Sequence, residues 1–429
     1  MAFLTLARLF LETYFLFLTN ILFWLVLLLA AFQYQRLSLT EIQLFGRARH
    51  SFWRQTAYSA LFGLAGGLLA SVMIVFFGIP LLEIGIAYVW PLAIMLLLIH
   101  PRYLCFAYAG GLVGVFSAVL QLLERYWPAI STGLLSGLAD IHIAGLLALI
   151  GILHLTESFL IAVSGHLFAS PIFLKTNQGV VGGFTLQRFW PLPLVGLLAM
   201  TLPEAAAATA GAVPMPEWWP IFASRTVPDA GETLMYLLLP IVAGLGYGDI
   251  AVSTTPRRKS RSSSRNLSAY SLLLLAVAFL AFRLPALTIL AALFAPLGHE
   301  FLIMMGNKKE FAGQALYVSP PVGVRVLDIF PRSPAAAAGL VPGDVLLAVN
   351  GMPVERQLFY DSLRQAGAGA MINLERDGRH YRLRLDGTGD PGIILVPDHA
   401  TPLYAEVQHR HFFSLLRERL APRGNKKEK

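Results

Sequence analysis

Repeated apolar runs are the feature that most constrains how this chain folds. Several of them reach the roughly 20 residues that an α-helix needs to cross a hydrocarbon core. Of the 429 residues, 56% are hydrophobic and only 14% are charged, whereas a soluble domain usually carries about 25% charge. The bilayer is therefore the main solvent for about the first 300 residues.

Hydropathy and turn signals predict nine membrane spans. The predicted spans are residues 13–33, 57–79, 82–99, 103–123, 138–163, 190–211, 233–253, 268–283 and 286–305. The first run lacks a basic leader beyond Arg8 and a cleavage site, so we interpret it as a retained span rather than a signal peptide. The last two are short, and Arg283 and Pro285 between them are also consistent with a tight hairpin or a re-entrant pair.

Basic residues orient these spans, because loops rich in Lys and Arg stay in the cytoplasm. If the spans alternate, one side holds Arg36, Arg47, Arg49, Arg54, Arg102, Lys175, Arg188 and the basic run from Arg257 to Arg265. We therefore expect a multi-pass plasma-membrane protein whose chain from Lys308 onward is cytoplasmic. The net charge of +8 is explained by contact with anionic lipid and does not indicate nucleic-acid binding.

After the membrane region the pattern changes to short alternating strands and turn dipeptides. Val322, Val324 and Val326 alternate along one predicted strand, and the segment from Ser333 to Leu340 is typical of a short capped helix. The segment 357–366 indicates a second helix. Together with Gly323-Val-Arg-Val, Ser333-Pro-Ala-Ala, Ala338-Gly-Leu-Val-Pro-Gly-Asp344 and Val349-Asn-Gly351, this order resembles a bacterial PDZ domain.

The resemblance implies a peptide-binding groove. PDZ domains add an extended peptide to a sheet edge, and we place that groove between the strand 322–329 and the helix 357–366. Its expected residues are Val322, Gly323, Val324, Arg325, Val326, Phe359 and Leu363. The preceding Ser319-Pro-Pro-Val322 lacks two N–H donors, so an internal peptide is as good a candidate ligand as a C-terminal carboxylate. The alternative is a PDZ fold that only packs on its own membrane domain.

Ionisable residues inside the predicted spans are a second group of candidates. His154 and Glu157 are three residues apart on one helical face, which favours a buried pair, a proton relay or part of a metal site. The single cysteine, Cys105, is interpreted as a small apolar residue in a helix. We expect no metal site and no cofactor.

An intramembrane protease is a weaker hypothesis. His299-Glu300 matches half of the zinc motif of site-2 proteases, but position 303 is Ile where the second histidine belongs. Leu385-Asp-Gly387 matches the third-ligand motif but lies in the predicted soluble domain. We expect no enzymatic activity and place His299 and Glu300 at the cytoplasmic exit of the last span.

The complete layout resembles the Firmicute membrane proteins related to the cell-division determinant MinJ. That resemblance implies a scaffold linking DivIVA to MinC and MinD, and hence a role in septum placement. The predicted fold class is a mainly α polytopic membrane domain of about nine spans plus a C-terminal α+β PDZ-like domain. Alternatives are a degenerate site-2-type protease and a transporter or sensor that uses His154 and Glu157.

The predicted domains are residues 1–306 in the membrane, 307–388 as the cytoplasmic PDZ domain, and 389–429 as a basic tail. Within the tail, residues 402–420 carry Phe412, Phe413, Leu416 and Leu420 near helical spacing. This spacing favours an amphipathic helix on the membrane surface or a helix packed on the PDZ domain.

Overall fold

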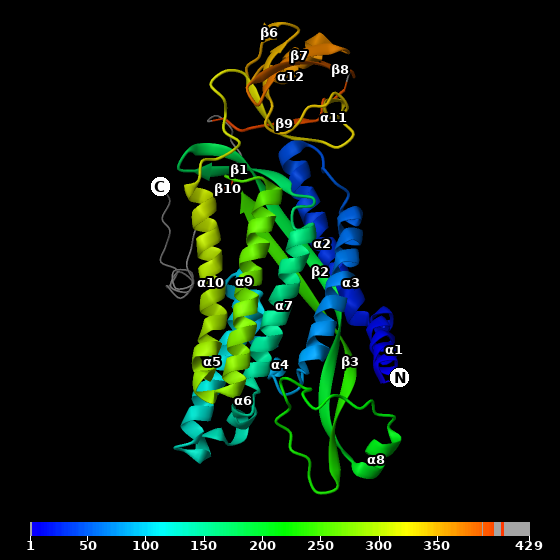
Figure 1. Ribbon diagram of the computed structural model, residues 1–429. Coiled ribbons are helices and arrows are strands. Elements are labelled where there is room, and N and C mark those ends of the chain that lie inside the picture. The colour runs from blue at the N-terminus through cyan, green and yellow to red at the C-terminus, as the bar shows by residue number, and fades with distance from the viewer. Residues whose placement is uncertain (1, 388, 399–404, 407–429) are drawn as a thin grey trace.

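A computed structural model describes residues 2–387, 389–398 and 405–406 of the chain (Figure 1). A bundle of long helices is traversed by a β-hairpin, and a β-rich domain caps one end of the bundle. The prediction of a mainly helical membrane domain followed by an α+β domain is confirmed. The predicted tail segment 402–420 lies almost entirely outside the described residues.

Six helices in the described chain are long and apolar enough to cross a membrane. They are α2 (Ile21–Phe45), α3 (Phe52–Phe77), α5 (Phe106–Glu124), α7 (Ile143–Ser164), α9 (Pro256–Arg283) and α10 (Thr288–Ala312). Shorter helices are α1 (Ala2–Phe15), α4 (Ile86–Ile99), α6 (Ser136–Ala139) and α8 (Glu204–Thr209). At the centre of the bundle, α7 packs against α3, α5, α9 and α10.

Two of the nine predicted spans are strands. Residues 190–211 fall mainly in β2 (Gly179–Pro203) and residues 233–253 in β3 (Glu232–Ala251), which pair antiparallel along the bundle (Figure 1). Hydropathy does not separate a buried strand from a buried helix. Pro191 and Pro193 are the local reason for the strand, because two closely spaced prolines break a helix interior.

The prolines also solve a hydrogen-bonding problem on the outer edge of β2. Alternate residues of a strand direct their backbone groups to the same edge. Phe189 N donates to Tyr34 Oη at 3.0 Å, and Val195 N donates to Ser71 Oγ at 2.8 Å. Positions 191 and 193 lie between them on that edge and carry no N–H at all. From residue 189 to residue 195 this edge therefore has no orphan donor of the kind that is costly in a bilayer.

The carbonyl oxygens of the two prolines face α3. There, Gly63 packs on the oxygen of Pro191 and Gly67 packs on the oxygen of Pro193, so closely that a Cβ atom at either glycine would overlap the oxygen. The four-residue spacing places both glycines on one helical face. The close contact at this pair of glycines is therefore between a helix and a strand.

The helix pair α4 and α5 turns back inside the bundle. The short helix η2 (Pro101–Leu104) joins them, and Arg102 within it contacts Glu300 in the middle of α10. This placement corrects the predicted position of Arg102 in a cytoplasmic loop. The ion pair with Glu300 provides the buried partner that an intramembrane arginine requires.

The C-terminal domain forms one sheet with two helices. Its elements are β4 (Val324–Ile329), α11 (Pro334–Ala337), β5 (Val345–Val349), β6 (Met352–Pro353), α12 (Phe359–Ala366), β7 (Ala370–Arg376), β8 (Arg379–Leu385) and β9 (Ile393–Leu395). The strand order is β8-β7-β5-β4-β9, with β6 on β5. The sheet therefore includes β9, which lies beyond the expected boundary at residue 388.

A second small sheet lies beneath this domain. It joins β1 (Ser170–Thr176) to β2, and β10 (Ala405–Glu406) pairs with β1 in parallel. Gly182 in β2 donates its N–H to the carbonyl oxygen of Tyr317 at 2.8 Å, which ties the start of the C-terminal domain to the hairpin.

The contact between α3 and β2 generates a stability prediction. We expect Gly67→Ala to destabilise the protein by about 1 to 3 kcal/mol, because the new Cβ overlaps backbone that cannot move aside. Gly306→Ala is the matched control, since Gly306 lies in α10 with open space around it. The control should be neutral or stabilising by up to about 1 kcal/mol. Thermal unfolding in detergent measures both, and equal melting temperatures would contradict this packing.

Candidate peptide-binding groove and buried polar cluster

The structure corrects the predicted position of the groove. Strand β4 was expected to form the free edge, but β9 pairs with it antiparallel, with Val326 opposite Leu395 and Ile329 opposite Ile393. On its other side β4 pairs with β5. An interior strand has no free backbone edge to offer, so a peptide is unable to add there.

The predicted groove side chains are mostly core residues. Val324, Val326, Phe359 and Leu363 are all buried in the apolar cluster of this domain, and Phe359 has no exposed surface. Val322 is exposed, and Arg325 reaches back to donate to the Leu316 carbonyl at 3.1 Å. Gly323 adopts a φ of 77°, which only glycine takes easily. The helix predicted at residues 357–366 is α12 (Phe359–Ala366), but its apolar face belongs to the core.

In the described chain the outer edge of β9 faces α12. Tyr360 on α12 donates its hydroxyl to the Ile393 carbonyl at 2.8 Å, and Arg356 donates to the Val396 carbonyl. Beside this edge lies a hollow of about 430 Å³ whose lining includes Tyr360, Leu363, Arg364, Leu385, Asp390 and Pro391. A strand edge next to a helix and a hollow is the arrangement that β-strand addition uses.

The membrane domain closes one side of this groove. A second hollow of about 340 Å³ lies between β9 and the membrane domain, and Tyr360, Ile394, Phe45 and Phe173 all line it. Ile394 also belongs to the same buried apolar cluster as the membrane helices. We define the β9–α12 groove as the outer edge of β9, the facing side of α12 and these two hollows.

Two arginines of the membrane domain contact the C-terminal domain. Arg49 lies 2.9 Å from Asp328, which is almost fully buried, and Arg47 lies 4.0 Å from the centre of the Phe330 ring and 3.4 Å from Asp390. Burial raises the pKa of Asp328 to about 6, although Arg49 opposes the rise. Charged and aromatic contacts therefore hold the two domains together.

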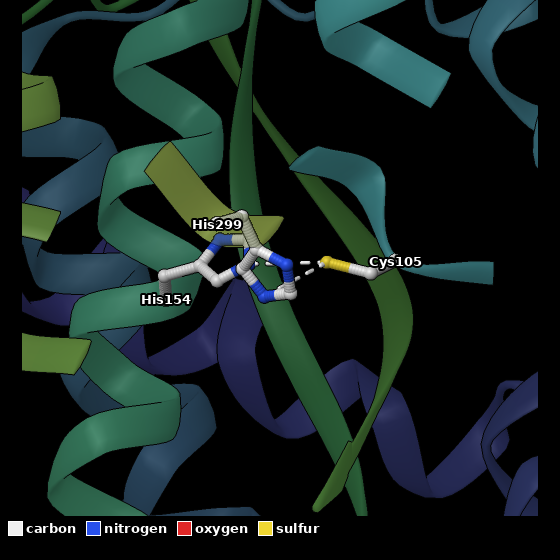
Figure 2. Close-up of side chains that lie close together, drawn as sticks. All are labelled: Cys105, His154 and His299. Carbon is white, nitrogen blue, oxygen red and sulfur yellow. Dashed lines mark hydrogen bonds between the residues drawn. The ribbon is translucent and has the colours of Figure 1, made fainter. Parts of the chain in front are cut away.

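Three polar residues inside the membrane domain form a cluster that the sequence alone does not predict. Figure 2 shows Cys105, His154 and His299 with their side chains converging. Cys105 Sγ lies 3.1 Å from His154 Nε2 and 3.8 Å from His299 Nε2. The three residues come from the start of α5, the middle of α7 and the middle of α10, so no spacing along the chain marks them as neighbours.

The residues beside this cluster form a polar network. Glu300 accepts hydrogen bonds from Tyr108 Oη at 2.6 Å and from Arg102 at 2.9 Å. His299 and Glu300 therefore lie within the bundle and not at the cytoplasmic exit of α10, because this helix continues to Ala312. With both of its oxygens engaged, Glu300 is a structural partner of Arg102.

No hydrogen bond or ion pair joins His154 to Glu157 in the described chain, and the ring nitrogens of His154 make other contacts. His154 Nδ1 lies 2.8 Å from the Ile150 carbonyl, and its Nε2 faces Cys105. Another histidine, His142, accepts from Gly145 N at 2.8 Å and caps the start of α7.

Two comparisons connect the chain to known proteins. A PDZ domain family model matches residues 325–366, which confirms the resemblance drawn from the motifs. The cell division topological determinant MinJ of Bacillus subtilis (strain 168) is 26% identical over 408 residues, covering 89% of this chain and 94% of MinJ. The chain is thus a PDZ-containing membrane protein similar to MinJ along most of its length.

The raised pKa of Asp328 predicts how docking responds to pH. Folding and docking favour the protonated carboxyl, so this contribution is complete below the ordinary value near 3.8 and is lost as the pH rises through about 6. Arg49 and Glu41 are the charged groups that act on Asp328 across the interface. Acidification from about pH 7.5 to about pH 5 should therefore tighten docking.

Hydrogen exchange of residues 324–330, corrected for intrinsic rates, measures the effect. Asp328→Asn should remove the pH dependence, because an amide does not titrate. His50 at the same surface stays neutral in this range, since burial lowers its pKa to about 4. Stronger protection at the higher pH in the wild type would contradict the assignment.

Proposed function

We propose that this protein is a membrane-anchored adaptor whose β9–α12 groove binds a protein partner at the bacterial division site. The observation that carries the proposal is the available strand edge of β9 beside α12, in a PDZ domain fixed to a helical membrane anchor. The similarity to MinJ, a cell division topological determinant, supports the placement in division. The division proteins that this resemblance implies, DivIVA and MinD, are the first partners to test.

The charge distribution supports a cytoplasmic position of the PDZ domain. The turn between α2 and α3, the start of α9 and the end of α10 lie at the end of the bundle that carries this domain (Figure 1), and they hold Arg47, Arg49, Lys259 and Lys309. The loops after α5 and after α8 lie at the opposite end (Figure 1) and hold Trp127 and Trp218, where aromatic residues suit a membrane interface. Positive charge on the PDZ side supports a cytoplasmic orientation.

Binding at this groove requires local rearrangement. A peptide strand pairing with β9 needs the outward-facing Ile393 carbonyl, which now accepts from Tyr360. Arg356, which donates to the Val396 carbonyl just beyond β9, also lies 3.5 Å from Asp398. Partner binding therefore exchanges an internal hydrogen bond of Tyr360 for an intermolecular one, which favours a modest affinity.

The protease alternative finds little support in the geometry. Asp386 of the Leu385-Asp-Gly387 triplet lies in the PDZ domain and pairs with Arg384 at 2.8 Å. The histidine that packs against His299 is His154 of another helix, with the ring centroids 5.1 Å apart, and not a second histidine one turn away. A site-2 motif is thus not formed by the residues that suggested it.

Affinity capture tests the proposed function with two matched tyrosines. Tyr360 on α12 is 39% exposed and Tyr381 on β8 is 41% exposed. We expect Tyr360→Asp to reduce recovery of division-site proteins from the native bacterium by about tenfold, since it places a charge in the groove. Tyr381→Asp lies outside the groove and should leave recovery unchanged.

A second variant distinguishes loss of binding from loss of folding. Arg364→Glu changes an exposed side chain that lines the larger hollow and pairs only with the neighbouring Asp361 among the described contacts. It should also weaken capture while the melting temperature stays unchanged. Equal recovery by all variants would refute the groove, and loss of unrelated proteins alone would refute the role in division.

A further inference from the structure

We propose that Cys105, His154 and His299 form a zinc site inside the membrane domain. Their ligand atoms Sγ, Nε2 and Nε2 all lie within 4.8 Å of one another (Figure 2). A thiol and two imidazoles are donors that select zinc or copper over calcium and magnesium. The inference does not depend on the proposed adaptor function.

The distances between the donors suit a zinc ion at their centre. Zinc binds sulfur at about 2.3 Å and nitrogen at about 2.0 to 2.1 Å, so tetrahedral angles separate these ligand atoms by about 3.5 Å. The two observed sulfur–nitrogen separations are 3.1 and 3.8 Å. They bracket the required value, and small side-chain movements bring both to it.

Hydrogen bonding prepares His154 for this role. Its Nδ1 lies 2.8 Å from the Ile150 carbonyl, which can only accept a hydrogen bond. Nδ1 therefore carries the proton, and Nε2 presents its lone pair toward Cys105. Metal-binding histidines in proteins are commonly oriented by such a bond at the other ring nitrogen.

Aromatic rings and the Arg102–Glu300 pair surround the cluster. Tyr270 packs edge-on against both His154 and His299, and Tyr108 packs against His299 while its hydroxyl binds Glu300. These ring contacts fix the orientation of the two imidazoles, as the outer contacts of metal-binding histidines commonly do.

The coordination sphere keeps one position open. In the described chain the cluster contains three ligand residues, and zinc sites with three protein ligands add a water or another small ligand as the fourth. The bound ion would join the η2–α5 turn to α7 and α10, three elements far apart in the sequence. Zinc would thus pin the re-entrant turn inside the bundle.

Metal analysis of the tag-free, full-length chain in mild detergent tests the site. After loading with zinc and desalting, the wild type should retain about one zinc per chain. Cys105→Ser and His299→Gln should each lower retention by about tenfold or more. His166→Gln is the control, because it removes a histidine outside the cluster and should retain zinc like the wild type.

Cobalt loading of the wild type gives a reading that does not depend on variant folding. Cys105 is the only cysteine of the chain, so a thiolate-to-cobalt charge-transfer band in the near ultraviolet reports its ligation alone. Such a band, removed by added zinc, supports the site. Absence of the band, equal zinc retention by Cys105→Ser and the wild type, or retention of copper without zinc would overturn the proposal.

Discussion

The packing of the membrane domain depends on the backbone hydrogen-bonding groups of the β2–β3 hairpin. In hydrocarbon, every N–H and C=O group needs a partner, and a strand edge carries many of them. On the outer edge of β2 the donors are dealt with in two ways: Pro191 and Pro193 carry none, and the N–H groups of Phe189 and Val195 bond to Tyr34 and Ser71. The glycines of α3 follow from it, since only they allow the helix to lie on the proline carbonyls.

The hairpin also connects the bilayer to the PDZ domain. Its strands continue past the helices into the sheet with β1, where Gly182 bonds to Tyr317 at the start of the C-terminal domain. Asp328 and Phe330 then meet Arg49 and Arg47 from the turn between α2 and α3. The domain is thus fixed at several points, and the orientation of its groove is set by the membrane domain and not by a flexible linker.

Features set by neighbouring residues are predictable from the sequence, whereas features set by contacts between distant residues are not. Caps and turns are local, and Ser333 accepts from Ala336 N as its position before Pro334 predicts. Hydropathy found apolar residues but not their conformation, so the hairpin was assigned to helices. The pairing of β9 with β4 and the cluster around Cys105 bring together residues that are far apart in the sequence. Neither composition nor residue spacing predicts such contacts.

The position of the groove links recognition to docking. Tyr360 and Ile394 line the hollow against the membrane domain, while Tyr360 also holds the β9 edge that a peptide needs. A bound strand must displace Tyr360 from the Ile393 carbonyl, and the neighbouring Asp390 is held by Arg47. Occupation of the groove therefore perturbs the same contacts that fasten the PDZ domain, so partner binding and domain docking share one set of interactions and each alters the free energy of the other.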